Sequence, residues 1–439
     1  MITAGQPQPE GIVDPLLNEQ QELIEIYFNQ LNHVFPIFDR THSLTTLQHP
    51  STTEADPEAD ILATGKNGIL ALADRMRALS EPGHIQRTPT PECLERAMEN
   101  GKPLILAAPS ISTIQTLLVM SLTMLNPPHT LAQASSFLAI AIRHAQILNL
   151  HTLNMVDGVG AADRLARIRL FWCLYIADMD LSLLMSKPPI FVDEDIFVLE
   201  PKEFSDDGLG LVVSSDGARV LNLFTARQRL ARVQRQLYSR LHTFMAQHMP
   251  TVERERSVLE MGAVLEEWRM TWYAGDGVLI SEELWPRWTL VHIVRLHFAY
   301  FATLLAANPC VPSSEELVNS LLMRLQETDL SAQAVFGKPP VRLVEAARTT
   351  FKAARIIRRG GLAWLMECLR FTISATLVLL QGVIANPEAT MASQDLGRVD
   401  TWIELFEHLS DQSADEIMGA RTETAARLRS HAAKALGVD

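Results

Sequence analysis

The amino-acid sequence predicts an all-α protein, folded as a large multi-helix bundle. Apolar residues recur at helical spacing over most of the 439 residues, whereas the alternation typical of strands never persists. Aromatic residues, which strands favour, make up only 6% of the chain. Apolar residues make up 47% and charged residues 20%, a composition that indicates a folded chain rather than a disordered one.

The first two helices are expected on either side of a polar loop. Asn18 resembles a helix N-cap, and apolar residues then recur at helical spacing until Pro36. Residues 49–57 are polar and include two prolines, so they predict a loop. A second helix is expected over Ile61–Leu79, because a Ser-Glu-Pro-Gly sequence follows it.

Residues 103–142 contain no Asp, Glu, Lys or Arg. They predict two helices, Ser110–Leu125 and Thr130–Leu150, separated by a pair of prolines. A membrane-spanning helix needs about 20 mostly apolar residues in a row. Leu104–Leu125 reaches that length only by including a proline and several hydroxyl side chains. The sequence therefore favours a pair of buried helices over a membrane span.

The strongest helical signal covers Asp163–Met185, which carries a wide apolar face and is ended by Lys187, Pro188 and Pro189. A loop with several acidic residues follows it, and no helix is expected before residue 219. The later helices are expected over residues 219–247, 251–272, 285–307, 313–330, 341–359, 362–385, 398–409 and 414–436.

Motifs that carry catalysis or bind a cofactor are not evident in the sequence. No P-loop, dinucleotide-binding glycine motif or nucleophile elbow is present. The cysteines at 93, 173, 310 and 368 are too far apart for a Cys-x-x-Cys zinc pair and too few for a secreted disulfide scaffold. His144 and His151 share a helical face without a nearby carboxylate or thiol, which favours half-buried histidines over a metal site. No catalytic residue, metal or cofactor is expected, although an enzyme is not excluded.

The formal net charge of −13 argues against a generally basic surface for nucleic acid. One local exception is a segment without acidic residues that contains Arg229, Arg232 and Arg240. On a continuous helix these three lie near one another and could form a basic surface for a partner. The alternative, which the net charge favours, is a solvated face that pairs with acidic residues elsewhere in the chain.

The helix predicted over Asp163–Met185 contains a motif of charged and aromatic residues at a defined spacing. Residues 167–178 contain Arg169, Phe171, Trp172, Tyr175 and Asp178 in the pattern Arg-x-Phe-Trp-x-x-Tyr-x-x-Asp. The turn at 188–189, Pro-Pro, and an acidic loop that reaches a proline at 201 come next. Because aromatic side chains bury a large area, we expect these three to lie at the centre of a helix bundle. The Arg and Asp can pair with neighbouring charges or with the loop, so the motif favours an architectural role over ligand contact.

These residues, together with the segment His-Val-Phe-Pro-Ile-Phe-Asp-Arg that contains Phe35 and Pro36, resemble the fungal-specific transcription factor domain. This domain is the middle homology, or regulatory, region of fungal zinc-cluster transcription factors. The resemblance covers about residues 20–385. It departs from the family pattern at Met179, where an Arg is common, and at Ser186-Lys187, where Gly-Arg is usual. The six-cysteine zinc cluster of the family is also missing from this sequence.

The resemblance implies a domain organisation and a function. We expect a flexible N-terminal segment over residues 1–17, the regulatory domain over 18–385 and a helical extension over 386–439. The implied function is transcription regulation in the nucleus, through a protein partner, a homodimer or a small-molecule effector, and the control of a metabolic or biosynthetic gene set. Neither sequence-specific DNA contact by this chain nor membrane association is expected. The alternatives are a helical body recruited as a biosynthetic enzyme or metabolite-binding protein, and a fragment of a full zinc-cluster factor.

Overall fold

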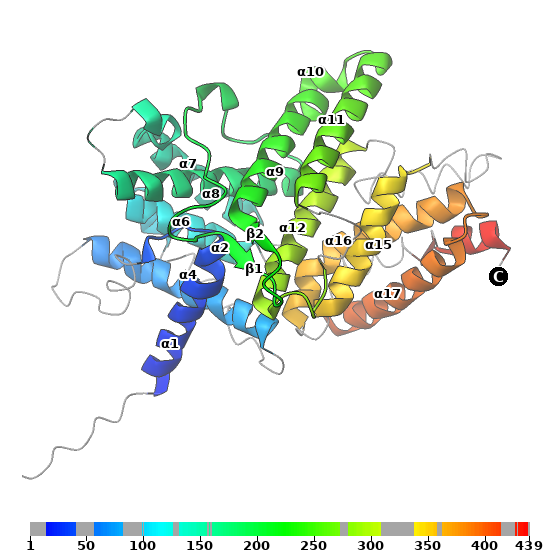
Figure 1. Cartoon of the computed structure of the whole chain (residues 1–439), viewed down its shortest axis with the longest axis horizontal. Helices are drawn as coiled ribbons and strands as arrows, with labels where there is room; N and C mark the ends of the chain where they lie inside the picture. Colours follow the sequence, from blue (N-terminus) through cyan, green and yellow to red (C-terminus); the bar gives the residue numbers. More distant parts are fainter. Residues whose placement is uncertain are drawn as a thin grey trace, which may run out of the picture.

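The computed structural model describes residues 15–40, 57–81, 99, 101–125, 131–155, 158, 160–272, 280–308, 338–357, 362–413, 426–427 and 429–437. It confirms the all-α fold class (Figure 1). Within these ranges the strands are limited to one antiparallel hairpin, β1 (Leu211–Val213) and β2 (Val220–Asn222). The expected helix over 313–330 and most of the one over 414–436 lie outside the described residues.

The N-terminal half is built from helices near the expected ranges, but the first of them begins at Pro15, so Asn18 lies inside it and is not its N-cap. Ser110 caps one of them by accepting a hydrogen bond from the backbone N–H of Thr113. The helices are α1 (Pro15–Ile26), α2 (Asn32–Val34), α4 (Pro57–Ser80), α6 (Ile111–Met124), α7 (Leu131–Ile147) and α8 (Ala161–Met185), with the short helices η1 (Tyr27–Leu31), η2 (Lys102–Ile105), η4 (Leu150–Met155) and η5 (Asp193–Asp195).

Helices α6 and α7 pack against each other, and the predicted pair of buried helices is confirmed for α6 and for one face of α7, whose other face, with Arg143, is exposed. Two buried hydroxyl groups of α6 have backbone acceptors: Ser121 Oγ donates to the carbonyl of Ala134 in α7 at 2.8 Å, and Thr123 Oγ1 donates to that of Val119 within α6. Among the described helices, α12 (Arg287–Ala307) is long and apolar enough to cross a membrane by composition. However, 72% of its apolar window is buried inside the protein, so α12 is a core helix.

The predicted helix over 219–247 is wrong in detail. Residues 220–222 form β2, α9 covers Leu223–Leu237, a π-helical turn η6 covers Tyr238–His242, and α10 covers Phe244–Gln247. The strands were missed because three residues are too short to show alternation. Gly217, with φ of +71°, forms the turn between them, and Asn222 caps α9 by accepting from the backbone of Thr225.

The remaining helices build the C-terminal half. They are α11 (Thr251–Trp272), α12 (Arg287–Ala307), α15 (Val341–Ile357), α16 (Leu362–Ala385) and α17 (Ala392–Ser413). The last of these begins earlier and ends later than the expected 398–409.

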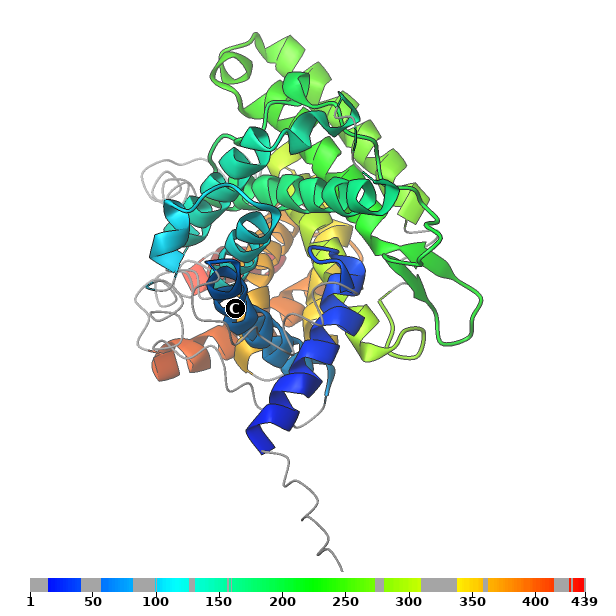
Figure 2. The ribbon, with the colours of Figure 1, turned by 90° about the vertical axis from the view of Figure 1, so that its left-hand side faces the viewer.

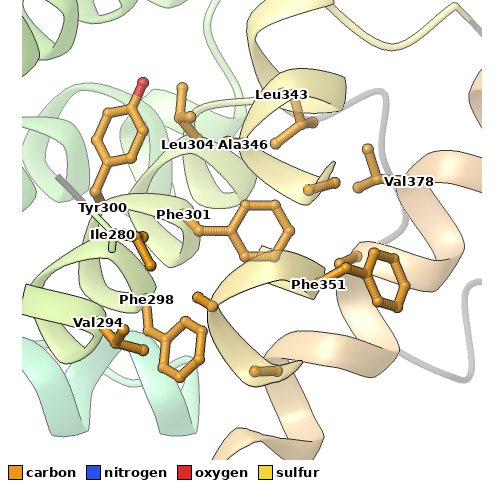
Figure 3. Packing of buried hydrophobic residues seen from close by; sticks show 14 of the residues in the cluster. Ile280, Val294, Phe298, Tyr300, Phe301, Leu304, Leu343, Ala346, Phe351 and Val378 are labelled. Carbon is orange, nitrogen blue, oxygen red and sulfur yellow. The ribbon is translucent and has the colours of Figure 1, made fainter. Parts of the chain in front are cut away.

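The core consists of two clusters of buried side chains. One lies among α1, α4, α6, α7 and α8, and the other among α9, α11, α12, α15, α16 and α17. Figure 2 shows the first group facing the viewer, with α12 and the later helices behind it. In the second cluster, side chains of α12, α15 and α16 meet, and the ring of Phe301 points toward α15 (Figure 3). Helix α12 contacts both α4 and α8 of the first group as well as α15 and α16. It therefore joins the two halves.

Candidate functional site in the loop after helix α8

Helix α8 presents the aromatic residues of the family-like motif to the first core cluster. Phe171, Trp172 and Tyr175 are buried, as the sequence predicts. The Phe171 ring makes edge contacts with Trp172 and with Phe191, each at a centroid distance of 5.2 Å. Phe191 belongs to the segment that follows α8, so the aromatic cluster draws that segment onto the helix.

The segment from residue 187 to residue 210, which we term the α8–β1 loop, runs antiparallel along α8. Trp172 Nε1 donates to the carbonyl of Leu199 at 2.8 Å, and the Tyr175 hydroxyl donates to Asp193 Oδ1 at 2.9 Å. One turn further along the helix, Asp178 accepts from the backbone N–H of Ile190. Motif residues later in α8 therefore contact earlier residues of the loop, as expected for two antiparallel segments.

Asp178 is the most deeply buried charge in this arrangement. Its carboxylate accepts hydrogen bonds from the backbone N–H groups of Ile190 and Phe191 at 2.9–3.0 Å. Burial raises the pKa of Asp178 to about 6, even though the two backbone N–H groups act in the opposite direction. The carboxyl group thus fixes the start of the loop by satisfying two of its backbone donors.

Arg169 fixes the other end of the loop. Its guanidinium makes two hydrogen bonds to the carboxylate of Asp207, at 2.6 and 2.7 Å. Burial raises the pKa of Asp207, but hydrogen bonds from Arg169, Ser205 and the backbone N–H of Leu209, together with the charge of Arg169, outweigh burial and hold the pKa at about 2. Sequence reasoning missed Asp207, because it lies 38 residues away and no local pattern marks it.

Helix α9 holds the loop from its other side. Arg235 lies 3.7 Å from Asp193, Arg232 pairs with Glu200, and Arg229 lies 3.5 Å from Glu203. Since these arginines are three residues apart, they lie along one side of the helix. Hydrogen bonds and ion pairs from both α8 and α9 therefore hold the acidic α8–β1 loop in place.

The arginines expected to form a basic surface are ion-paired within the chain. Arg229 and Arg232 contact the α8–β1 loop, whereas Arg240 pairs with Glu260 of α11 at 2.5 Å. The π-helical turn η6 breaks the helical register before Arg240, which is why the three do not share one set of partners. Arg229 and Arg232 also lie over the rings of Trp272 and Trp172.

The Phe35–Pro36 turn lies next to the end of the loop. Asn32 organises this turn, because its side chain accepts from the backbone N–H of Phe38 at 2.9 Å and donates to the carbonyl of Phe38. The backbone N–H of Gly210 donates to the carbonyl of His33, just before the turn. Sequence reasoning included His33, Phe35 and Pro36 in the segment that resembles the family, but it did not single out Asn32 and assigned no contact to His33.

Pro188 and Pro189 follow a left-handed residue at the end of α8. Ser186 has φ of +53°, and its backbone N–H donates to the carbonyl of Leu183. This is a conformation that glycine adopts without strain. It explains why the family pattern has glycine at the position that Ser186 occupies here.

The α8–β1 loop also exposes apolar side chains. Phe197, Leu199 and Phe204 are each more than half exposed, although the loop around them is fastened by hydrogen bonds and ion pairs. Exposed large apolar side chains that lie close together mark interaction surfaces in many soluble proteins. The fixed part of the loop thus presents apolar groups outward.

A pocket of about 330 Å³ lies beside the loop. It is lined by Arg143, Gln146, Ile147, His151 and Asp195. Gln146 Oε1 and His151 Nδ1 are buried without a hydrogen-bond partner among the described residues. Such atoms can hydrogen-bond to water or to a polar ligand.

No group of three or more His, Cys, Asp or Glu is placed to hold a metal ion in the part of the chain that the structure describes. Cys173 and Cys368 are buried thiols outside any disulfide bond. Cys173 is a core residue, and its burial raises the pKa of its thiol, which disfavours the reactive thiolate. Cys93 and Cys310 lie outside the described residues.

The fold and the site define an all-α protein in which two helices clasp a long acidic loop. The family described as "Fungal specific transcription factor domain" matches residues 24–269, more than half of the chain. The chain belongs to this family, as its motif residues predict.

The curated relatives are named as transcription factors. An "ABC-transporter-regulating transcription factor" of Aspergillus fumigatus is 27% identical over 418 residues, which cover 92% of this chain and 45% of the relative. A protein of the same description from Aspergillus oryzae is also 27% identical, with the same coverage. A "Fusaridione A cluster transcription factor" of Fusarium heterosporum is 21% identical over 89% of this chain and 72% of the relative. The chain thus spans about half the length of the two Aspergillus relatives.

Proposed function

We propose that this chain is the regulatory region of a transcription regulator that acts in the nucleus through a protein partner bound at the α8–β1 loop. The observation that carries the proposal is the loop itself. Hydrogen bonds and ion pairs from α8 and α9 hold the loop in place, yet its side chains Phe197, Leu199 and Phe204 remain exposed. A surface that is both rigid and apolar binds a partner with little cost in ordering.

The names of the relatives suggest which genes such a regulator controls. Two relatives are named as regulators of ABC transporters and one as a regulator of a biosynthetic cluster. We propose a target set of the same kind, either transporter genes or a metabolic gene cluster. Deleting the gene and profiling transcripts tests this proposal. Unchanged expression together with accumulation of a pathway intermediate would support the enzyme alternative instead.

The loop surface is tested by removing its apolar side chains. The double variant Phe197→Ser/Phe204→Ser should lose most of the transcriptional response while keeping the melting temperature within a few degrees, because both side chains face solvent. Leu106→Ser is the matched control, since Leu106 is 90% exposed at a distant position in the sequence. An equal loss of response in both variants would argue against a specific surface.

The pocket supports a small-molecule effector as a second candidate mechanism. Asp195 belongs both to its lining and to the loop, so a ligand there would contact the proposed partner surface. The unpartnered Gln146 Oε1 and His151 Nδ1 favour a polar ligand. Native mass spectrometry of protein purified from a fungal host should detect a bound molecule, and His151→Ala should reduce its occupancy. Identical spectra for both proteins would contradict this mechanism.

DNA reading by this chain itself is not part of the proposal. The chain matches less than half of the Aspergillus relatives, so a longer protein that carries a zinc cluster is an alternative source of DNA binding. Sequencing the full-length transcript shows whether this chain is part of a longer protein with a zinc cluster or acts without one. Six closely spaced cysteines upstream would make the chain a fragment of a complete zinc-cluster factor. A specific DNA shift by the purified chain alone at physiological salt would contradict the proposal.

A further inference from the structure

Helix α11 has apolar side chains on two opposite faces. One face is buried: Met261, Leu265, Trp268 and Trp272 pack into the second core cluster. The other face lies in solvent and carries Val252, Leu259, Ala263 and Met270. Val252 is 67% exposed, Leu259 75% and Met270 56%.

The four solvent-facing residues form a straight stripe along the helix. Each residue advances about 100° around an α-helix, so these four positions lie within about 20° of one line. The line lies opposite the buried face and runs nearly the whole length of α11, from Val252 to Met270. In Figure 1, α10 and the start of α11 extend beyond the rest of the molecule at the top, which leaves this part of the helix accessible.

The stripe is self-complementary when two copies are placed antiparallel. Val252 lies nine residues before Met261, and Met270 lies nine residues after it. Leu259 lies two residues before Met261, and Ala263 lies two after it. A two-fold axis at the level of residue 261 therefore pairs each large side chain with an apolar partner. Leu259 meets the small Ala263 of the second copy, which lets the helices approach closely.

The charges beside the stripe fit the same register. Arg256 and Glu267 lie on one side of the stripe and have no ion-pair partner among the described residues. With the axis at residue 261, Arg256 of each copy comes beside Glu267 of the other, and this contact occurs twice. On the opposite side, Glu255 approaches Glu266, whose charge is already shared with Arg269 at 2.7 Å and with Arg342 at 3.7 Å.

We propose that the exposed face of α11 is a homodimer interface, in which two copies pack α11 against α11 antiparallel around residue 261. The surface is distinct from the α8–β1 loop and does not depend on the function proposed for it. A single pair of helices about 33 Å long buries an area near the low end for stable complexes. The dimer should therefore form at micromolar concentrations. Two copies would also present both loops in a fixed, symmetric arrangement.

The experiment measures the mass of the full chain by sedimentation equilibrium between about 1 and 100 µM. The wild-type chain should change from monomer to dimer over this range. Leu259→Glu should remain monomeric throughout, and its circular dichroism melt should match the wild type because the side chain faces solvent. Leu106→Glu, at an exposed position elsewhere in the sequence, is the matched control and should still dimerise.

A charge exchange tests the register. Arg256→Glu should weaken dimerisation at least tenfold, because it places like charges side by side twice. The double variant Arg256→Glu/Glu267→Arg should restore most of the lost affinity, since it exchanges the two charges in both contacts.

Three results would overturn the proposal. A wild-type chain that stays monomeric at 100 µM shows that another partner, or another part of this chain, covers the stripe. A dimer that Leu259→Glu does not affect shows that the copies meet elsewhere. A double charge variant no better than Arg256→Glu alone excludes the antiparallel register.

Discussion

At the level of single residues, Asp178 of the α8 motif is the clearest case of a side chain whose charge depends on the loop that it binds. Asp178 is a carboxylate buried without a salt-bridge cation in direct contact, and it is retained by two backbone N–H groups of the loop. Its raised pKa reflects the balance between burial, which penalises the charge, and these hydrogen bonds, which favour it. The residue therefore links loop structure to pH.

The pH dependence of Asp178 can be measured directly. Its pKa is about 6 in the folded protein and 3.8 in the reference state, so the folded protein binds this proton more tightly. The contribution of Asp178 to stability should therefore fall as the pH rises from about 4 to 6, by up to about 3 kcal/mol. Chemical denaturation of the wild type and of Asp178→Asn at several pH values gives the difference. A difference that does not change with pH would contradict the raised pKa.

Ser186 supplies a second test at the level of one residue. Because it adopts a left-handed conformation with φ of +53°, Ser186→Gly should stabilise the protein by up to about 1 kcal/mol. Ser186→Val should destabilise it by more than that, since a β-branched side chain is strained there. Thermal melts of both variants test the conformation. Equal destabilisation by Gly and Val would show that the serine side chain itself is required.

Sequence reasoning located the motif residues but not their partners. Arg169, Trp172, Tyr175 and Asp178 stand out by their spacing within one helix. Their partners lie 12 to 38 residues later in an irregular loop, where no periodic pattern exists. The same limit applies to β1 and β2, because strands of three residues carry too little alternation to be recognised.

At the level of elements, α12 is fastened to both halves of the molecule by its histidines. His292 Nε2 donates to the carbonyl of Gln30 at 2.9 Å, in η1. His297 Nε2 donates to the hydroxyl of Thr350 at 3.0 Å, in α15. The sequence indicates that these two histidines, five residues apart, point to different faces of their helix, and the structure agrees.

Acid should weaken the attachment of α12 to its neighbours, because both histidines are buried in the neutral form. Burial lowers the pKa of His292 to about 3 and that of His297 to about 4, against 6.5 for an exposed histidine. Their contribution is complete above pH 6.5 and is lost as the pH falls toward 3–4, by about 2 kcal/mol per histidine between pH 6.5 and 5. This slope opposes that of Asp178.

The variant His292→Gln/His297→Gln isolates the effect, because glutamine can still donate a hydrogen bond but does not titrate in this range. Its free energy of unfolding should vary less between pH 6.5 and 5 than that of the wild type. Hydrogen exchange of α12 locates the change. An unaltered slope would show that the acid sensitivity originates elsewhere.

At the level of the whole molecule, the C-terminal helices share one core with the centre of the chain. The ring of Trp402 lies 5.6 Å from that of Phe351 in α15, and Val399 is buried in the same cluster. Asp395 is almost fully buried and accepts hydrogen bonds from two nitrogens of the Arg348 guanidinium in α15, Nε and Nη2, the shortest at 2.6 Å. The sequence predicts residues 386–439 as an extension, since the resemblance to the family ends near 385.

Removing residues 386–439 tests whether this segment is separable. The truncated chain should fail to fold, because the loss of several large buried side chains costs about 2–5 kcal/mol each, against a typical total of 5–15 kcal/mol. It would also leave Arg348 without Asp395. The matched control lacks only residues 1–14, part of the N-terminal segment predicted to be flexible, and should melt like the intact chain. Cooperative unfolding of the 1–385 chain at the wild-type temperature would show instead that residues 386–439 are an independent extension, as the boundary near 385 predicts.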